Sequence, residues 1–200
     1  MNDRGRYRQL TYFQLMEVTL RELLVEKGLL TERQIADAVE DMRRRTPERG
    51  ARVVAHAWTH PEYKERLIEN GTRACEELGL DVPALKLVVV ENTPQVHNVI
   101  VCTLCSCYPR MLLGIPPDWY KSRNYRSRMV REPRAVLAEF GLKVPRQTRI
   151  RVHDSTADMR YLVLPMRPAG TRGWSEERLA ALVTRDSMIG VAVAKKPRRK

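Results

Sequence analysis

Apolar residues near the start of the chain recur with the spacing of an α-helix. Between residues 10 and 27 the apolar positions are three or four apart, and Gly28 stands where a helix would end. Thr31 followed by Gln34 forms a capping-box pattern, and a second apolar face runs to about Arg45. The two segments predict a helical hairpin with too little apolar surface for a core. We therefore expect it to pack against the rest of the chain or against another protein.

Two further helical segments are expected after the hairpin, over residues 50–58 and 61–78. Pro61 suits the first turn of the second helix, and Gly79 suits its end. Cys75 falls among the apolar positions of this helix. We therefore expect it to be a small core residue rather than a reactive thiol.

The pattern changes to short β-branched runs after residue 85, which predict buried strands. Helical spacing returns over residues 124–140, with Pro133 as a weak point, and again between Ser175 and Thr184. Strands and helices are mixed without a strict βαβ alternation, which favours an α+β fold over a doubly wound sheet. The strands are expected at LKLVVV, VHNVIV, RIRVHD and RYLVLP, with a last strand or extended segment at MIGVAV.

Composition indicates a globular protein, because hydrophobic residues make up 43% of the chain and charged residues 30%. No run of about 18 apolar residues is present, so we expect no membrane span. The stretch MNDRGRYRQL lacks the apolar segment of a signal peptide, which predicts a cytoplasmic location with reduced cysteines. Three parts are expected: a helical arm over 1–48, a main domain over 49–193 that contains all four cysteines, and a basic flexible tail over 194–200.

The net charge of +12 is concentrated in the second half of the chain. Residues 1–100 hold 15 Lys and Arg against 16 Asp and Glu, whereas residues 101–200 hold 21 against 8. A basic half fits phosphate binding, but the sequence has no RNP, zinc-finger or recognition-helix pattern. We therefore favour a basic surface that keeps the protein soluble or meets an acidic partner subunit, and nucleic acid is not the expected ligand.

Three of the four cysteines stand within six positions, in the segment VIVCTLCSCYPR. Cys102, Cys105 and Cys107 directly follow an expected strand. A disulfide is a poor explanation, because bridged residues must meet strict separation and torsion requirements and three sulfurs leave one unpaired. Thiolates spaced this closely can instead bind one metal ion from a tight turn.

The spacing leaves the kind of metal open. Zinc would require a fourth ligand, for which His97 is the nearest candidate, although a histidine at the start of a strand is more often a hydrogen-bonded structural residue. The Cys-Ser-Cys segment offers a second arrangement, because it draws the backbone nitrogens of Ser106 and Cys107 towards the same ion. If deprotonated, these amides complete a five-ligand site that leaves one position for substrate or water.

The segment VCTLCSCYP and its flanks resemble the alpha subunit of nitrile hydratases. The similarity runs from about Leu10 to Val193 and is weakest near its start. It implies a layered α/β/β/α domain preceded by an N-terminal helical hairpin arm. The flanks that agree are VVVENTPQVHNV before the cysteines and GIPPDWYKSRNYRSRMVREPRAVLAEFGL, RYLVLPMRPAGT and LVTRDSMIGVAV after them.

The resemblance implies a cobalt(III) or iron(III) centre. Thr103 resembles the cobalt type, where the iron type usually has serine. By motif position, Cys102 stays a thiolate, Cys105 becomes a sulfinate and Cys107 a sulfenate. The amide nitrogens of Ser106 and Cys107 complete the ligand set. Metal binding lowers thiol pKa values and thiolates oxidise readily, which gives these modifications a physical cause.

The implied reaction is the addition of water to a nitrile, which yields an amide. The metal acts as a Lewis acid, and the attacking oxygen is either a metal-bound hydroxide or the sulfenate oxygen of Cys107. Ser106 either orients this nucleophile or is the small residue that the turn requires. The resemblance also implies two protein partners: a beta subunit whose arginines hold the oxidised cysteines, and an activator protein that delivers cobalt.

Departures from the family pattern leave the substrate open. Arg110 and Met111 stand where nitrile hydratase alpha chains usually carry Trp-Pro, and the gamma subunit of thiocyanate hydrolase, a cobalt relative, carries arginine there. A guanidinium beside the metal suits an anionic or hydrogen-bonding substrate, unless Arg110 points away and binds a partner carboxylate. Trp119 and Tyr120 either wall the substrate pocket or belong to the core, where aromatic residues after a Pro-Pro turn are more often found.

A second departure is the short segment between Gly79 and Leu87, in a chain that is unusually basic. Both features fit a beta subunit that is split into two chains, as in the toyocamycin nitrile hydratases, which act on a nucleoside nitrile. The expected function is therefore hydration of a nitrile, with polar or nucleoside nitriles as candidates. Thiocyanate hydrolysis is the alternative, and a zinc-bound nucleic-acid module is the hypothesis from a different class.

Overall fold

The structure is a computed structural model that describes residues 10–82, 86–105 and 107–197. The chain divides into two compact units, Met1–Arg44 and Arg45–Lys200. The sequence places this boundary after residue 48. The structure places it earlier because helix α3 (Pro47–Thr59) is already packed in the core of the second unit, where Val53 and Val54 are fully buried.

The first unit contains helices α1 (Tyr12–Glu26) and α2 (Glu32–Arg44). The capping box predicted before α2 is present: the Gln34 amide donates to Thr31 Oγ1 at 3.2 Å, and the Thr31 amide donates to Gln34 Oε1 at 2.8 Å. No residue of either helix is buried, and apolar side chains such as Leu20 are exposed. The described part of this unit therefore has no hydrophobic core.

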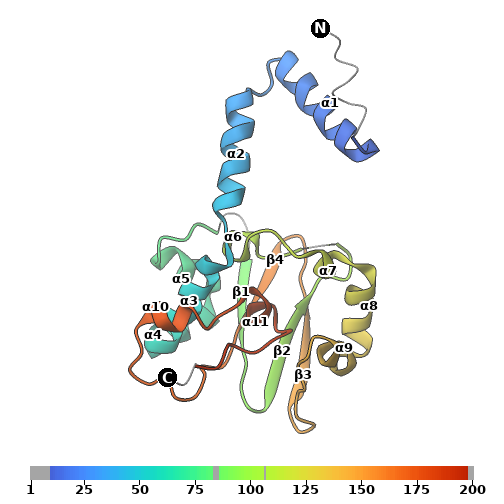
Figure 1. Ribbon diagram of the computed structural model, residues 1–200. Helices are drawn as coiled ribbons and strands as arrows, with labels where there is room; N and C mark the ends of the chain where they lie inside the picture. Colours follow the sequence, from blue (N-terminus) through green and yellow to red (C-terminus); the bar gives the residue numbers. More distant parts are fainter. Residues whose placement is uncertain (1–9, 83–85, 106, 198–200) are drawn as a thin grey trace. The chain divides into compact units, whose positions relative to one another are not determined.

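Two pairs of parallel strands form the centre of the second unit (Figure 1). Strand β1 (Lys86–Glu91) pairs with β4 (Met159–Leu164), and β2 (Val96–Val101) pairs with β3 (Arg149–Asp154). β2 also contacts β4, which joins the two pairs. Each strand thus pairs with a partner far away in the sequence, because parallel neighbours need a long connection.

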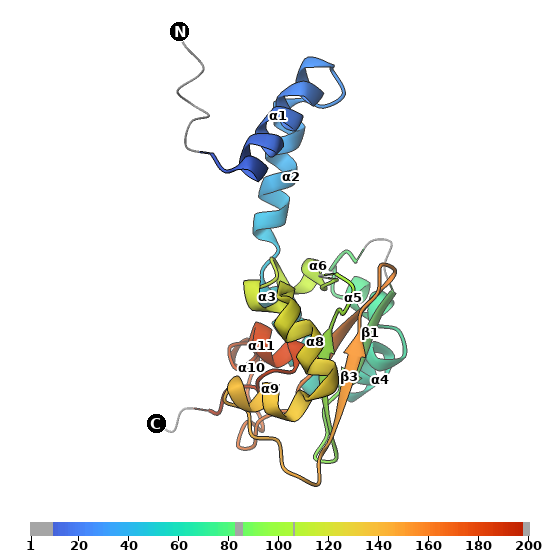
Figure 2. The same ribbon diagram turned by 90° about the vertical axis from the view of Figure 1, so that its right-hand side faces the viewer.

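Helices cover the strand pairs on both sides (Figures 1 and 2). They are α4 (Pro61–Glu69), α5 (Gly71–Glu77), α6 (Arg110–Leu113), α7 (Asp118–Lys121), α8 (Arg123–Arg131), α9 (Pro133–Glu139), α10 (Glu176–Ala180) and α11 (Arg185–Ile189). α4 and α5 pack against β1, whereas α8 packs against β2 and α9 against β3. The layers therefore run helix, strand pair, strand pair, helix, and the predicted α+β class is confirmed. None of the helices in the described ranges is long and apolar enough to cross a bilayer.

Two of the predicted helices are each divided in two. The helix expected over 61–78 stops at Asn70, whose side chain accepts a hydrogen bond from the Arg73 amide at 3.1 Å and so caps α5. The helix expected over 124–140 stops at Glu132, because Pro133 lacks an amide hydrogen and starts α9. Caps and prolines set these ends, which apolar spacing alone does not reveal.

Of the two alternatives for MIGVAV, a last strand or an extended segment, the strand is wrong, because the segment begins inside helix α11. Thr184 and Ser187 form a capping box, in which the Ser187 amide donates to Thr184 Oγ1 at 3.1 Å. Gly190 ends the helix in the left-handed conformation, with φ at 93°. The preceding helix, expected to reach Thr184, ends at Ala180.

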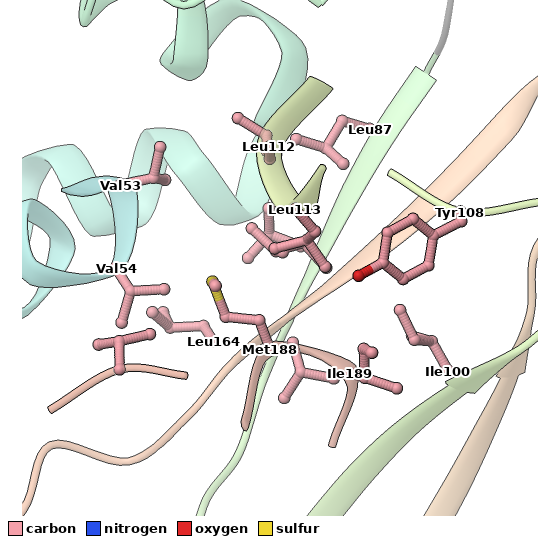
Figure 3. Close-up of a cluster of buried hydrophobic side chains, with 14 of the residues drawn as sticks. Val53, Val54, Leu87, Ile100, Tyr108, Leu112, Leu113, Leu164, Met188 and Ile189 are labelled. Atoms are coloured by element: carbon pink, nitrogen blue, oxygen red, sulfur yellow. The ribbon is translucent and has the colours of Figure 1, made fainter. Parts of the chain in front are cut away.

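The core links the segment after the cysteines to strands and helices from the whole second unit (Figure 3). The labelled side chains are Val53 and Val54 of α3, Leu87 of β1, Ile100 of β2, Tyr108, Leu112 and Leu113 of the segment after the cysteines, Leu164 of β4, and Met188 and Ile189 of α11. All of them are buried. Cys75 is buried too, as predicted, and burial raises the pKa of its thiol to about 12.

The start of the expected flexible tail lies on the core. Ala194 is buried, and the Lys195 amide donates to the Leu182 carbonyl at 2.8 Å. The chain is therefore held to the core up to this point. Residues 198–200 lie outside the described residues.

Replacement of Gly190 by alanine should destabilise the second unit strongly. An added Cβ would lie 2.1 Å from the Asn98 carbonyl oxygen and 2.8 Å from Val99 Cα, in a backbone conformation that side chains disfavour. We expect a loss of about 2–5 kcal/mol in the free energy of unfolding, measured by chemical denaturation. Gly173→Ala is the matched control, since Gly173 also has a positive φ but has nothing within 4 Å of the added atom. It should cost about 1–2 kcal/mol, and equal losses in the two variants would contradict this explanation.

Candidate metal centre

The structure brings the three clustered cysteines together where strand β2 ends. Cys102 follows Val101, the last residue of β2, and is buried, Cys107 is half-buried and Cys105 is exposed. The Cys102 and Cys105 sulfurs lie 3.1 Å apart, and the Cys105 and Cys107 sulfurs lie 2.7 Å apart. All three sulfurs lie within 4.8 Å of one another, so a single ion can contact all of them.

The sulfur separations fit a shared ion rather than a disulfide. They are too long for a disulfide, in which the sulfurs lie about 2.05 Å apart. Two thiolates bound at about 2.3 Å to one ion lie about 3.8 Å apart at a tetrahedral angle and about 3.3 Å apart at a right angle. The separations of 3.1 Å and 2.7 Å are shorter than either value, so an ion of either geometry would move the sulfurs apart.

Three side chains from elsewhere in the chain hold the cysteine loop in place. Asp154 accepts hydrogen bonds from the Thr103 amide at 2.9 Å and from the Thr103 hydroxyl at 2.5 Å. Arg126 donates to the carbonyls of Thr103 and Cys105 at 3.1 and 3.2 Å. Tyr120 donates to the Cys107 carbonyl at 2.9 Å. The loop is thus fastened on several sides, which limits the directions its sulfurs can take.

Contacts within the cluster shift the pKa values of Cys105 and Cys107 in opposite directions. Hydrogen bonds from Cys107 and Cys102 lower the pKa of the Cys105 thiol, because they stabilise its thiolate. Burial and the hydrogen bond to Cys105 raise the pKa of the Cys107 thiol to about 12. Arg160 favours the thiolate at both positions through its positive charge. Before a metal is bound, the Cys105 thiol therefore loses its proton more readily than the Cys107 thiol.

His97 has a structural role. Its Nε2 lies 2.7 Å from the Gly190 carbonyl oxygen, and burial lowers the pKa of its imidazole. Since a strand rises about 3.3 Å per residue, His97 and Cys102 are roughly 16 Å apart along β2. His97 therefore lies too far from the sulfurs to bind the same ion.

The predicted ligand Ser106 lies outside the described residues. The same holds for the proposed backbone ligand at position 106, whose placement the structure does not describe. The structure describes Cys105 and Cys107 on either side of it.

A cavity of about 380 Å³ opens beside the sulfurs. Arg110 lines this cavity, together with Arg45 and Arg160, and Cys105 and Cys107 form part of its wall. Three guanidinium groups around one small cavity favour a ligand that is anionic or accepts hydrogen bonds.

Trp119 and Tyr120 do not line this cavity. Tyr120 is fully buried, and its role at the site is the hydrogen bond to the cysteine loop. Trp119 packs edge-on against Tyr125 and Phe140, at 4.9 and 4.8 Å between ring centroids. In this chain, the aromatic residues after the Pro-Pro turn therefore belong to the core that supports the site.

Sequence reasoning missed Asp154, Arg126 and Arg160. Asp154 is the last residue of β3 and stands opposite Val101 in the strand register. Its position beside the loop therefore depends on a strand pairing that the sequence does not indicate. The usable signal is its position, because a charged residue at the end of a strand often faces a site. No such local signal marks Arg126, which is one of several arginines in its helix.

Comparison with known proteins places these residues in a family. The family model described as "Nitrile hydratase, alpha chain" matches residues 11–192. The cobalt-containing nitrile hydratase subunit alpha of Pseudonocardia thermophila is 54% identical over 179 residues, which cover 88% of each chain. The thiocyanate hydrolase subunit gamma of Thiobacillus thioparus is 46% identical over 195 residues, which cover 92% of this chain and 80% of that one.

Solved structures of related enzymes are similar to this chain in fold as well as in sequence. A double mutant of the Fe-type nitrile hydratase from Comamonas testosteroni Ni1 has a TM-score of 0.87 and 46% identity, with 92% of this chain and 91% of that chain covered. A recombinant thiocyanate hydrolase comprising partially modified cobalt centres also has a TM-score of 0.87, at 42% identity, with 96% of both chains covered. The similarity therefore extends over the fold as well as the motif.

Replacement of Asp154 by asparagine should reduce the metal content of the protein. The amide keeps the size of the carboxylate but loses the charge and one of the two acceptors that hold Thr103. Supporting contacts of this kind change metal affinity by about 10- to 100-fold. We expect less metal per chain after expression with added metal, measured by elemental analysis, and little change in melting temperature.

The matched control for this variant is Asp118→Asn. Asp118 is an exposed carboxylate whose ion pair is with Lys121 at 2.8 Å. It should leave the metal content unchanged. If Asp154→Asn bound as much metal as the control, Asp154 would have no part in holding the loop for the ion.

Proposed function

This chain belongs to the nitrile hydratase alpha-chain family, and from that premise we propose that it is the metal-binding catalytic subunit of a cobalt nitrile hydratase. The reaction adds water to the C≡N bond of a nitrile and yields an amide. The observation that carries the proposal is the convergence of three sulfurs from one loop directly after β2. A zinc-bound nucleic-acid module is not favoured, because the family model that matches the chain is a nitrile hydratase alpha chain and the sequence has no zinc-finger pattern.

Cys102, Cys105 and Cys107 would hold the cobalt through sulfur, and the amide nitrogens of Ser106 and Cys107 would complete the ligand set. Cobalt is favoured over iron because the relatives that support the assignment include cobalt-containing enzymes and because Thr103 stands between the first two cysteines. When bound, cobalt supplies Lewis-acid polarisation of the nitrile.

The chain's own residues would supply the nucleophile and hold it in place. We assign the attacking oxygen to the sulfenate of Cys107, since this role explains why a third cysteine is needed in an oxidised form. Water would then attack the Cys107 sulfur: a new S–O bond forms as the old one breaks, the former sulfenate oxygen leaves in the amide, and the two hydrogens of the water end on the amide nitrogen. The hydroxyl of Ser106 would orient this oxygen. Asp154 and Arg126 fix the loop, and Cys107 lines the cavity, so the oxygen would face the cavity in a constant direction.

The arginines around the cavity support a second candidate, the metal-binding subunit of a thiocyanate hydrolase. Arg110 and Arg160 lie beside Cys105 and Cys107 in the cavity wall, and their charge favours an anion such as thiocyanate. The similarity to a thiocyanate hydrolase subunit gamma supports the same alternative. For a nitrile hydratase, these arginines favour polar nitriles, a nucleoside nitrile among them, over aliphatic ones.

We propose that the chain works with a beta subunit, either whole or split into two chains. The exposed apolar side chains of α1 and α2, Leu20 and Met42 among them, would be covered by this partner. An activator protein would deliver the cobalt. A cytoplasmic location is part of the proposal, because the cysteines must stay reduced until they bind the metal.

Co-expression with the proteins encoded beside this chain, with cobalt supplied, tests the function. We expect amide formation from at least one of the aliphatic, aromatic and nucleoside nitriles, about one cobalt per chain, and an intact mass with about three added oxygen atoms. Cys107→Ser should abolish activity, whereas Cys75→Ala, at the buried core cysteine, should retain the oxidised form. Consumption of thiocyanate with no amide from any nitrile would move the assignment to the second candidate, and zinc with unmodified cysteines would overturn both.

Replacement of Arg110 by glutamine separates the two substrates. If Arg110 faces the substrate, loss of its charge should lower kcat/KM for thiocyanate by about 10-fold, the effect of one partly screened charge contact, and should affect an uncharged nitrile less. Arg123→Gln is the matched control, since Arg123 is an exposed arginine of α8 that does not line the cavity. An unchanged ratio of the two kcat/KM values in Arg110→Gln would show that Arg110 does not select the substrate.

A further inference from the structure

A second group of metal-binding side chains lies at the junction of α3, α4 and α10. His56 stands in the last turn of α3, and His60 ends α3 and begins α4. Pro61 starts the next helix immediately, so the two histidines stay one helical turn apart. Their rings stack with 4.0 Å between centroids and 24° between planes. Both imidazoles are thereby directed towards the same neighbour.

That neighbour is Glu176, the first residue of α10. Its Oε1 lies 3.0 Å from His56 Nδ1 and 3.3 Å from His60 Nδ1. Ser175 caps α10 and fixes the direction in which the helix starts, so the carboxylate is held beside the two rings. One ligand atom from each of the three residues lies within 4.8 Å of the other two.

The two distances from the carboxylate match those between ligands of a metal site. Ligand atoms that lie about 2.0–2.1 Å from a tetrahedral ion are about 3.3–3.4 Å apart. The carboxylate oxygen is 3.0 and 3.3 Å from the two imidazole nitrogens, and all three ligand atoms lie within 4.8 Å of one another, so one ion can contact all three. Thr59 Oγ1 lies 3.1 Å from the same oxygen and 2.9 Å from His60 Nδ1, which places a hydroxyl near the fourth corner.

The surroundings suit an ion that enters from solvent. The side chains of His56, His60 and Glu176 are 24%, 52% and 34% exposed, so an ion can reach the group without unfolding of the core. Tyr63, which is buried, packs edge-on against the His56 ring at 4.6 Å and limits its movement. Two imidazoles and one carboxylate are a typical donor set for Zn²⁺ and related ions.

We propose that His56, His60 and Glu176 form a second metal site that binds a divalent ion of the Zn²⁺ class. It shares no residue with the cysteine centre, and none of the three lines the cavity beside the sulfurs. The ion ties α10 to the junction of α3 and α4, which are more than a hundred positions away in the sequence, and its role is structural. The site therefore stabilises the second unit without taking part in the reaction.

The test measures Zn²⁺ binding to the full-length protein, in its co-purified assembly, by calorimetric titration after treatment with EDTA. We expect one Zn²⁺ per chain that is lost, or bound at least about 10- to 100-fold more weakly, in His60→Ala and in Glu176→Gln. Glu177→Gln removes the exposed carboxylate next to Glu176 and should bind like the parent protein. Zn²⁺ should raise the melting temperature of the parent and of Glu177→Gln, but not of the other two variants.

A background in which Cys102, Cys105 and Cys107 are all replaced by serine separates the two sites. The Zn²⁺ that depends on His60 should still bind in this background. Unchanged Zn²⁺ binding in both His60→Ala and Glu176→Gln would overturn the proposal, as would loss of all Zn²⁺ binding in the serine background. Glu176→Gln keeps the size of the side chain, so its result stands even if His60→Ala unfolds.

Discussion

The parallel pairing of β2 with β3 is the constraint on which the site depends. The register places Val101 opposite Asp154, so the residue that ends β3 stands beside the loop that leaves β2. The Asp154 carboxylate then binds both the amide and the hydroxyl of Thr103 and fixes the first turn of the loop. A slip of one residue would turn Asp154 to the other face of the strand pair and remove this support. The positions of the sulfurs therefore follow from a pairing between strands that lie about fifty residues apart in the sequence.

The residues that follow the cysteines fix the other end of the loop, because they are buried in the core. Tyr108, Leu112 and Leu113 follow the cysteines directly and are buried among residues of α3, β4 and α11 (Figure 3). The loop thus has a strand at one end and buried anchors at the other, and Arg126 and Tyr120 bind its carbonyls in between. These contacts reduce the conformational entropy that the described residues of the loop lose when an ion binds.

Local signals made part of this structure predictable. The capping pair of Thr31 and Gln34, the core position of Cys75 and the convergence of three cysteines after a strand could all be read from short segments. Contacts between distant segments could not be read from the sequence in this way. The strand partners are set by packing across the whole second unit, and the support from Asp154 exists only once that pairing has formed. The strand predicted at MIGVAV failed for a local reason, because the cap formed by Thr184 and Ser187 outweighs the β-branched residues that follow.

The unequal exposure of the sulfurs gives a physical reason for their proposed oxidation states. Cys102 is 1% exposed, whereas Cys105 is exposed and Cys107 is half-buried. Oxidation of a thiolate requires both the thiolate form and access for the oxidant. Cys105 has the greater access and the lowered pKa, which fits the sulfinate with its two oxygens, and Cys107 has less access, which fits the sulfenate with one. Cys102 is nearly closed to an oxidant, which fits the proposed thiolate, so the depth of each sulfur in the fold matches its proposed oxidation state.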